Sequence, residues 1–165
     1  RRQKMFGFLN KLKGIELCSP LTGEAVELSG VPDPVFAEKM VGDGIAIKPT
    51  SGTVVAPCDG KVVQIFPTNH AVGIETSTGL DLLIHIGIDT VELKGDGFKR
   101  LVEEGMSVKK GQPILEVDLK RIEELGKSIV SPFIITNVDE VEFKEYKTGG
   151  VQAGETVVLV LKKKK

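Results

Sequence analysis

Short hydrophobic segments recur along the chain, and polar turn residues interrupt them about every eight to twelve residues. The segments are rich in Val, Ile and Leu, whereas Gly, Pro, Asn and Asp make up the interruptions. This pattern predicts an all-β protein with strands at residues 25–28, 45–48, 52–56, 60–66, 71–76, 81–86, 107–108, 113–117, 131–135 and 156–161. Turns are predicted at Asp43-Gly44, Asp59-Gly60 and Thr78-Gly79.

Three short helices are predicted beside these strands. The clearest begins with Asp118 as its N-cap, carries aliphatic residues along one side and stops at Gly126. The other two are predicted to begin at Asp33-Pro34 and at Gly97-Phe98.

A faint internal repeat relates residues 108–115 to residues 151–158 through the pattern V-x-x-G-x-x-(I/V)-(L/V). Two copies are too few for a solenoid, so they indicate a duplicated β unit with quasi-twofold symmetry. The fold class that follows is an antiparallel β-sandwich of the barrel-sandwich, duplicated hybrid type, with a few short helices at its edges.

The chain length indicates how many domains to expect, and the charge argues against some classes of partner. A chain of 165 residues suits one domain, which we place at residues 15–161. Residues 1–14 are interpreted as a flexible basic N-terminal segment, and residues 162–165 as a solvated lysine tail. The net charge of -1, with both signs mixed along the chain, argues against a nucleic-acid surface. No apolar run is long enough to span a membrane and no signal peptide is apparent, which favours the cytoplasm.

Several chemistries lack their residues in this sequence. Cys18 and Cys58 stand alone, without a second pair or a zinc-ligand pattern, and are interpreted as reduced core-like side chains. The stretch Gly126-Lys127-Ser128 resembles the end of a phosphate-binding loop, but Arg121 stands where that loop needs its first glycine. The motifs of dinucleotide binding, zinc proteases and nucleophile-elbow hydrolases are absent.

Candidate chemistry therefore rests on the two histidines. Alternation along 81–86 places Leu82, Ile84 and Ile86 on one face, so His85 points outward if that aliphatic face is core. An extended chain at 68–70 would put Thr68 beside His70, where its hydroxyl could bind an imidazole nitrogen. A neutral imidazole can attack a phosphoryl group while a second one binds the phosphate. By spacing alone, however, two histidines 15 residues apart are no motif, and a lone histidine in a strand is more often structural.

Three stretches carry a resemblance: residues 31–49 (VPDPVFAEKMVGDGIAIKP), 68–71 (TNHA) and 85–98 (HIGIDTVELKGDGF). They resemble the enzyme IIA component of the glucose class of the bacterial phosphotransferase system, and the match runs in family order from about residue 15 to 161. The resemblance implies a phosphocarrier that takes a phosphoryl group from the histidine phosphocarrier protein and passes it to the IIB domain of a glucose-type permease, driving sugar uptake. It identifies His85 as the phosphorylated residue, reacting through Nε2. It identifies His70 as the phosphate-binding neighbour and Thr68 as the residue that orients His70.

The resemblance also implies a partner-binding surface around the histidines. Its apolar members would be Phe36, Met40, Val41, Phe66, Leu83 and Val91. Asp33 and Asp89 would be carboxylates that meet basic residues of the partners, although Asp33 could equally be a helix N-cap because Pro34 follows it. Pro34 itself stands where relatives often carry an aliphatic residue. No cofactor is required for the transfer, and the membrane is reached only through the permease.

Two alternatives come from the class of binding modules. His70 and His85 could bind zinc at a regulatory interface with metabolic enzymes or transporters, provided that a partner's carboxylate completes the site. Residues 51–63 and 102–114 resemble biotinyl and lipoyl carrier domains. That interpretation is disfavoured because no Met-Lys hairpin lies between the two stretches and the chain is about twice the length of such a domain.

Overall fold

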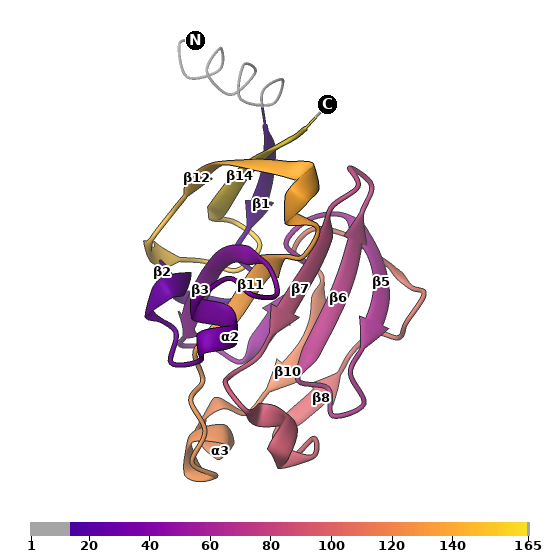
Figure 1. Cartoon of the computed structure of the whole chain (residues 1–165). Helices are drawn as coiled ribbons and strands as arrows, with labels where there is room; N and C mark the ends of the chain where they lie inside the picture. The colour runs from indigo at the N-terminus through magenta and orange to yellow at the C-terminus, as the bar shows by residue number, and fades with distance from the viewer. Residues whose placement is uncertain (1–13, 165) are drawn as a thin grey trace.

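The computed structural model describes residues 14–164, in which antiparallel strands form three sheets (Figure 1). The strands are β1 (Ile15–Cys18), β2 (Gly23–Glu27), β3 (Asp43–Pro49), β4 (Thr53–Val55), β5 (Gly60–Ile65), β6 (Ala71–Thr76), β7 (Asp81–His85), β8 (Phe98–Arg100), β9 (Ser107–Val108), β10 (Pro113–Val117), β11 (Ser131–Ile135), β12 (Val141–Tyr146), β13 (Gly149–Val151) and β14 (Val157–Lys163). Apart from Gly14, the N-terminal segment predicted at residues 1–14 lies outside the described residues.

The helical segments are short and lie at the ends of strands. They are α2 (Pro34–Ala37), α3 (Leu119–Glu124) and the single 3-10 turns η1 (Leu28–Gly30), η2 (Thr90–Leu93) and η3 (Val138–Glu140). Two N-caps predicted from the sequence are present. The carboxylate of Asp33 accepts a hydrogen bond from the amide of Val35 at 2.9 Å, and that of Asp118 accepts one from Arg121 at 3.0 Å. These caps satisfy amide groups that a first helical turn leaves unpaired.

The sheet order explains the sandwich. An eight-stranded sheet has the order β13-β2-β3-β11-β7-β6-β5-β9, and two three-stranded sheets have the orders β1-β14-β12 and β4-β10-β8. In Figure 1, β8 and β10 lie behind β5, β6 and β7. The predicted fold class, an antiparallel β-sandwich with a few short helices, is therefore confirmed.

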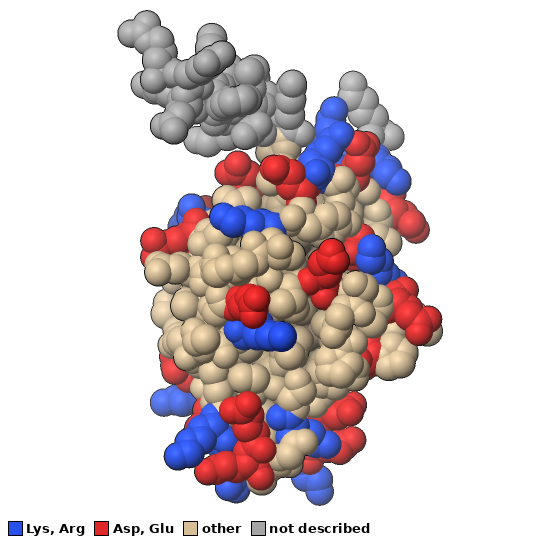
Figure 2. Space-filling view, turned by 90° about the vertical axis from the view of Figure 1, so that its left-hand side faces the viewer, with Lys and Arg blue, Asp and Glu red and all other residues tan. Residues whose placement is uncertain are grey.

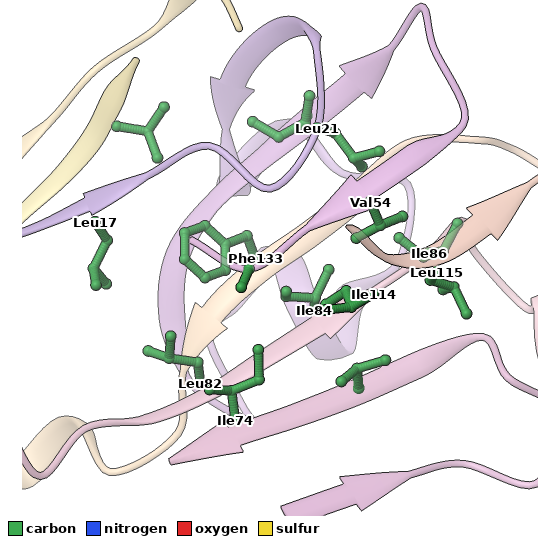
Figure 3. Packing of buried hydrophobic residues seen from close by; sticks show 14 of the residues in the cluster. Leu17, Leu21, Val54, Ile74, Leu82, Ile84, Ile86, Ile114, Leu115 and Phe133 are labelled. Atoms are coloured by element: carbon green, nitrogen blue, oxygen red, sulfur yellow. The ribbon is translucent and has the colours of Figure 1, made fainter. Parts of the chain in front are cut away.

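Buried aliphatic side chains from these sheets meet in one large cluster (Figure 3). Ile84 of β7, Ile114 of β10 and Phe133 of β11 are each at most 1% exposed. Removing such side chains from water is the main favourable contribution to folding, at roughly 2 kcal/mol for each large aliphatic group. Because β7 supplies the cluster with one face only, its other face remains for the site described below.

The two copies of the internal repeat have the same local structure. The first spans β9 and β10, the second spans β13 and β14, and each has a glycine with positive φ between its strands. The amide of Gly111 donates to the carbonyl of Ala56 at 2.8 Å, and that of Gly154 donates to Ser19 at 2.9 Å. A Cβ atom on Gly154 would lie 2.9 Å from the Cα atom of Gly111, so the two glycines are in contact where the copies meet. This arrangement supports the predicted duplication.

Two local predictions were wrong. Asp43-Gly44, predicted as a turn, begins β3, where a Cβ atom on Gly44 would lie 2.2 Å from the carbonyl oxygen of Phe133. The glycine is needed there because two strands approach closely, not because the chain reverses. Gly97-Phe98, predicted to open a helix, leads instead into β8, where Phe98 pairs with Val117.

Four strands were not predicted, namely β1, β8, β12 and β13. They are short, or, like β12, carry one fully buried residue among charged ones. At the C-terminal end, β14 continues through Lys163, two residues beyond the predicted boundary. Lys162 and Lys163 pair with Glu142 and Val141 of β12, so two residues of the predicted tail belong to the sheet.

Candidate active site

Strand pairing brings the two histidines together. In the β6–β7 ladder Ala71 lies opposite His85, so His70, which immediately precedes β6, is next to the end of β7. The centroids of the two imidazole rings are 4.9 Å apart, and the ring planes are inclined by 81°. The rings are thus close enough to contact one small group together.

His85 is the last residue of β7 and is half-buried. Its neighbours Leu82, Ile84 and Ile86 are at most 2% exposed, so the predicted outward orientation is confirmed. Its Nδ1 atom lies 2.8 Å from the carbonyl oxygen of Gly87. Because a carbonyl can only accept, Nδ1 carries the ring proton and donates it. The lone pair of the neutral ring is therefore on Nε2.

Gly87 takes a backbone conformation that a side chain would prevent. Its φ angle is +74°, in the left-handed region that favours glycine. A Cβ atom there would lie 2.5 Å from Cγ2 of Thr90 and 2.7 Å from the carbonyl oxygen of Ser128. The residue that orients His85 is thus limited to glycine by both its conformation and its surroundings.

His70 is 3% exposed and lies at the end of a turn that begins at Phe66. Asn69 has a φ of +60°, and its amide donates to the carbonyl of Phe66 at 2.7 Å. Thr68 Oγ1 hydrogen-bonds His70 Nδ1. The predicted contact is present, but a tight turn and not an extended chain produces it. With the hydroxyl donating, Nδ1 accepts and Nε2 of His70 carries the proton.

Neither Nε2 atom is fully buried. Neither has a hydrogen-bond partner within residues 14–164. No side-chain nitrogen or oxygen of those residues is both buried and unpaired. Each Nε2 therefore reaches the surface. That of His85 carries a lone pair, and that of His70 carries a proton when the Thr68 hydroxyl donates to Nδ1.

The environment keeps both rings neutral at pH 7. Burial, assisted by the proximity of His85, lowers the pKa of His70 from 6.5 to about 4. Burial also lowers the pKa of His85, although the Gly87 carbonyl and the carboxylates of Asp33 and Asp89 act in the opposite direction. A neutral His85 is required for nucleophilic attack, because protonation would occupy its lone pair.

The predicted apolar residues differ in their exposure and in their contacts with the two imidazole rings. The ring of Phe36 lies 4.9 Å from that of His85, and Phe66 lies edge-on to His70 at 5.3 Å. Phe36 is only 7% exposed and belongs to a second core cluster, against which Leu83 also packs. The exposed members of the predicted set are Met40, Val41 and Val91.

The two predicted carboxylates differ in their local roles. Asp33 is half-buried and caps α2, so the alternative of a plain N-cap describes its hydrogen bonding. Asp89 is exposed and has a left-handed φ of +58° just before η2. Both are near enough to His85 to affect its pKa.

The sequence reasoning missed three residues that hold the histidines. Gly87 orients His85, and the hydroxyl of Ser131 accepts a hydrogen bond from the Gly87 amide at 3.1 Å. Nε of Arg100 donates to Oδ1 of Asn69 at 2.8 Å, inside the turn that carries His70. A glycine two residues after the candidate nucleophile was the available signal for Gly87. Ser131 and Arg100 are far from the histidines in sequence, so no local pattern could have identified them.

A metal ion at this site would find two free histidine nitrogens as ligands. The described residues contain no group of three or more His, Cys, Asp or Glu side chains placed to hold a metal ion. The Nδ1 atoms are engaged by Thr68 and Gly87, which leaves two Nε2 atoms. A zinc ion needs at least one further protein ligand, so the donor set of this chain alone does not fit.

Neither histidine lines the cavity beside Tyr146. This cavity of about 300 Å³ is lined by Lys39, Asp43 and Tyr146 among others. Figure 2 shows charges of both signs interspersed over one face, without a continuous field of either sign. In residues 14–164 no helix has the length and apolar character that crossing a membrane requires. Two imidazoles flanked by the apolar rings of Phe36 and Phe66 suit a protein partner.

Comparisons with known proteins agree with this geometry. Residues 15–141 match the family model described as phosphoenolpyruvate-dependent sugar phosphotransferase system, EIIA 1. The chain is 48% identical over 161 residues to the glucose-specific EIIA component of the phosphotransferase system of Haemophilus influenzae, covering 97% of each.

Two further relatives extend the comparison. The chain is 52% identical over 147 residues to a glucoside-specific EIICBA component of Staphylococcus carnosus, of which it covers 21%. The solved structure of glucose permease IIA from Mycoplasma capricolum is similar, with a TM-score of 0.85 and 42% identity over 90% of this chain and 96% of that one.

Proposed function

The chain belongs to the EIIA 1 family of the phosphoenolpyruvate-dependent sugar phosphotransferase system, and we propose that it carries phosphoryl groups by reversible phosphorylation of His85. The donor is the histidine phosphocarrier protein, and the acceptor is a cysteine on the IIB domain of a glucose-class permease. The observation that carries the proposal is the anchored Nδ1–H of His85 beside a second imidazole, which leaves Nε2 as the nucleophile.

Transfer to His85 requires one bond to form and one to break. The Nε2 lone pair attacks phosphorus in line as the nitrogen–phosphorus bond of the donor histidine breaks. No proton has to leave, because the ring keeps its proton on Nδ1, where the Gly87 carbonyl accepts it. The positive charge that develops on the ring is opposed by the nearby carboxylates of Asp33 and Asp89.

His70 stabilises the phosphoryl group without reacting. Its neutral ring accepts the Thr68 hydroxyl at Nδ1 and offers Nε2–H to a phosphoryl oxygen. The low pKa of His70, about 4, avoids a second positive charge next to His85 before the phosphoryl group arrives. When the Thr68 hydroxyl donates to Nδ1, His70 is left as a donor at Nε2.

The apolar residues around the histidines provide the docking surface. Val41, Val91 and the highly exposed Met40 (69%) can exclude water when a partner covers them, while Phe36 and Phe66 support the rings. Transfer between two proteins needs such exclusion, because an electrostatic contact is stronger in a dry site. Asp33 and Asp89 would meet basic groups of both partners. The fused EIICBA relative supports the pairing of an EIIA unit with a permease.

The transfer requires no cofactor, and the protein would act in the cytoplasm, where the phosphocarrier and the IIB domain are found. Binding to regulated enzymes or transporters, with zinc held by His70, His85 and a partner's carboxylate, stays a prediction. It would use the same two Nε2 atoms as the transfer, so a bound zinc ion would block phosphorylation.

The proposal is tested by mixing the protein with phosphoenolpyruvate, enzyme I and the histidine phosphocarrier protein. We expect the intact mass to rise by one phosphoryl group that is stable in base and labile in acid. His85→Ala should remain unlabelled, whereas His70→Ala should accept the group but fail to pass it to a IIB domain.

Asp81→Asn is the matched control, because Asp81 lies exposed at the opposite end of β7 from His85. It should accept and pass on the phosphoryl group at the wild-type rate. An unlabelled wild type, with folding and partner activity verified, would contradict the proposal.

A further inference from the structure

Two consecutive peptide groups determine where the Gly87 carbonyl points. The first joins Ile86 to Gly87: its carbonyl accepts from Thr90 Oγ1 at 2.5 Å, and its N–H donates to Ser131 Oγ at 3.1 Å. The second joins Gly87 to Ile88: its carbonyl faces His85 Nδ1, and its N–H donates to the carbonyl of Ser128 at 3.1 Å. Every polar group of both peptides is therefore paired.

Ser131 links this loop to the central part of the large sheet. It is the first residue of β11, where it pairs with Ile47 of β3, and it is 1% exposed. Its hydroxyl donates to the carbonyl of Ile129 at 2.8 Å, so only its lone pairs can face the Gly87 amide. The orientation of this acceptor is thus fixed by a rigid strand.

We propose that Ser131 is a positioning residue that keeps His85 in the Nδ1–H tautomer. It holds the Ile86–Gly87 peptide, and thereby the orientation of the next peptide, whose carbonyl faces Nδ1. The inference deepens the proposed phosphocarrier function and rests on it for its catalytic meaning. Without the Ser131 oxygen, the buried N–H of Gly87 has no partner, and a buried unpaired amide is costly. Rotation of the glycine to relieve that cost turns the carbonyl away from His85.

Loss of the carbonyl removes the preference between the two ring tautomers. The proton then occupies Nε2 in a larger fraction of molecules, and such a ring cannot attack through Nε2. A hydrogen bond of ordinary strength corresponds to about a 5-fold population ratio. The Nδ1–H to Nε2–H ratio of His85 should fall by about that factor in Ser131→Ala.

The test is nitrogen-15 NMR of the imidazole rings in the full-length, uniformly labelled protein at pH 8. Protonated and unprotonated ring nitrogens differ widely in chemical shift, so the tautomer ratio of His85 is read directly. We expect the ratio to fall in Ser131→Ala and to recover in Ser131→Thr, which keeps a hydroxyl. The transfer rate at saturating phosphocarrier should follow the Nδ1–H fraction of His85 and fall by about 2-fold, with the KM for that partner unchanged.

Ser19→Ala is the matched control, because Ser19 is an equally buried serine whose hydroxyl donates to Leu21. It should leave the His85 ratio at the wild-type value. If Ser131→Ala does not fold, the nearly isosteric Ser131→Cys replaces it. A folded variant with the wild-type ratio would overturn the inference. Failure of the wild type to accept a phosphoryl group would instead overturn the proposed function, since the tautomer measurement needs no transfer.

Discussion

The backbone carbonyl of His70 accepts a hydrogen bond from the amide of Ile86 at 2.7 Å. This bond continues the β6–β7 ladder beyond Ala71 and His85. The distance between the two catalytic candidates is therefore set by main-chain pairing, which is stiffer than contacts between side chains. A site built in this way is preorganised, so little rearrangement is needed when a phosphoryl group arrives.

Gly87→Ala should disrupt the site more than an ordinary glycine substitution. The new Cβ atom would collide with Thr90 and with the backbone of Ser128, in addition to the strain of a positive φ. We expect the free energy of unfolding to fall by at least about 3 kcal/mol. Urea unfolding at pH 7 measures this change.

Gly105→Ala is the control for the backbone contribution alone. Gly105 has a φ of +91°, but nothing lies within 4 Å of its missing Cβ. Its substitution should lower the free energy of unfolding by about 1–2 kcal/mol. Equal losses in the two variants would show that the packing around Gly87 has no special importance.

Alternation within β7 was sufficient to orient His85, because period-2 burial is a local property of the sequence. Leu82 and Ile84 are buried and Leu83 and His85 are half-buried, as the aliphatic pattern predicted. The bounds of β6, β9, β10 and β11 were also predicted correctly from such runs. Strands with a continuous or alternating apolar face can be read without knowing their partners.

Edge strands, and glycines required where two strands approach closely, could not be predicted in this way. β12 is stabilised by pairing with β14 and has only Val141 fully buried, so its sequence resembles that of a loop. Gly44 resembles a turn residue until the neighbouring strand is known. Ser131 affects His85 through Gly87, 44 residues away in sequence from Ser131. These features depend on tertiary neighbours, which a single sequence does not display.

The two cysteines should be nearly inert in the folded protein. Burial raises the pKa of Cys58 to about 12 and also raises that of Cys18, so at pH 8 the thiolate of Cys58 is roughly a thousandfold less populated than that of a free cysteine. We expect a thiol reagent such as Ellman's reagent to label neither residue within minutes until urea unfolds the chain. The variants Cys18→Ser and Cys58→Ser each leave one cysteine, so the labelling rate of each thiol can be measured separately. Rapid labelling of either variant in its native state would contradict this expectation.

Protonation of His70 should destabilise the fold in mildly acidic solution. The folded pKa of about 4 lies below the ordinary value of 6.5, so the unfolded chain binds the proton more readily between these pH values. The stabilisation from neutral His70 is present above about pH 6.5 and is lost as the pH falls through 4. The full loss is about 3 kcal/mol.

Urea unfolding from pH 7 to 4 measures this loss when wild type and His70→Asn are compared. Carboxylates titrate in both proteins, so the difference between them isolates the histidine. The variant should lose less stability than the wild type as the pH falls. Parallel curves would mean that His70 takes up its proton equally well in both states.

Asp89→Asn should lower the pKa of His85 further, because the Asp89 carboxylate favours the charged imidazole. Asparagine tolerates the left-handed backbone at this position, so the change removes the charge with little strain. Asp33→Asn should act in the same direction while keeping the α2 cap. Proton NMR titration of the His85 ring measures both pKa shifts. Asp81→Asn, at the far end of β7, should leave the pKa of His85 unchanged.

Asp89→Asn and Asp33→Asn should also accept phosphoryl groups more slowly, because the phosphorylated ring loses a compensating charge. If the pKa of His85 in Asp89→Asn equals that of the wild type, the Asp89 carboxylate does not affect the charge of this ring.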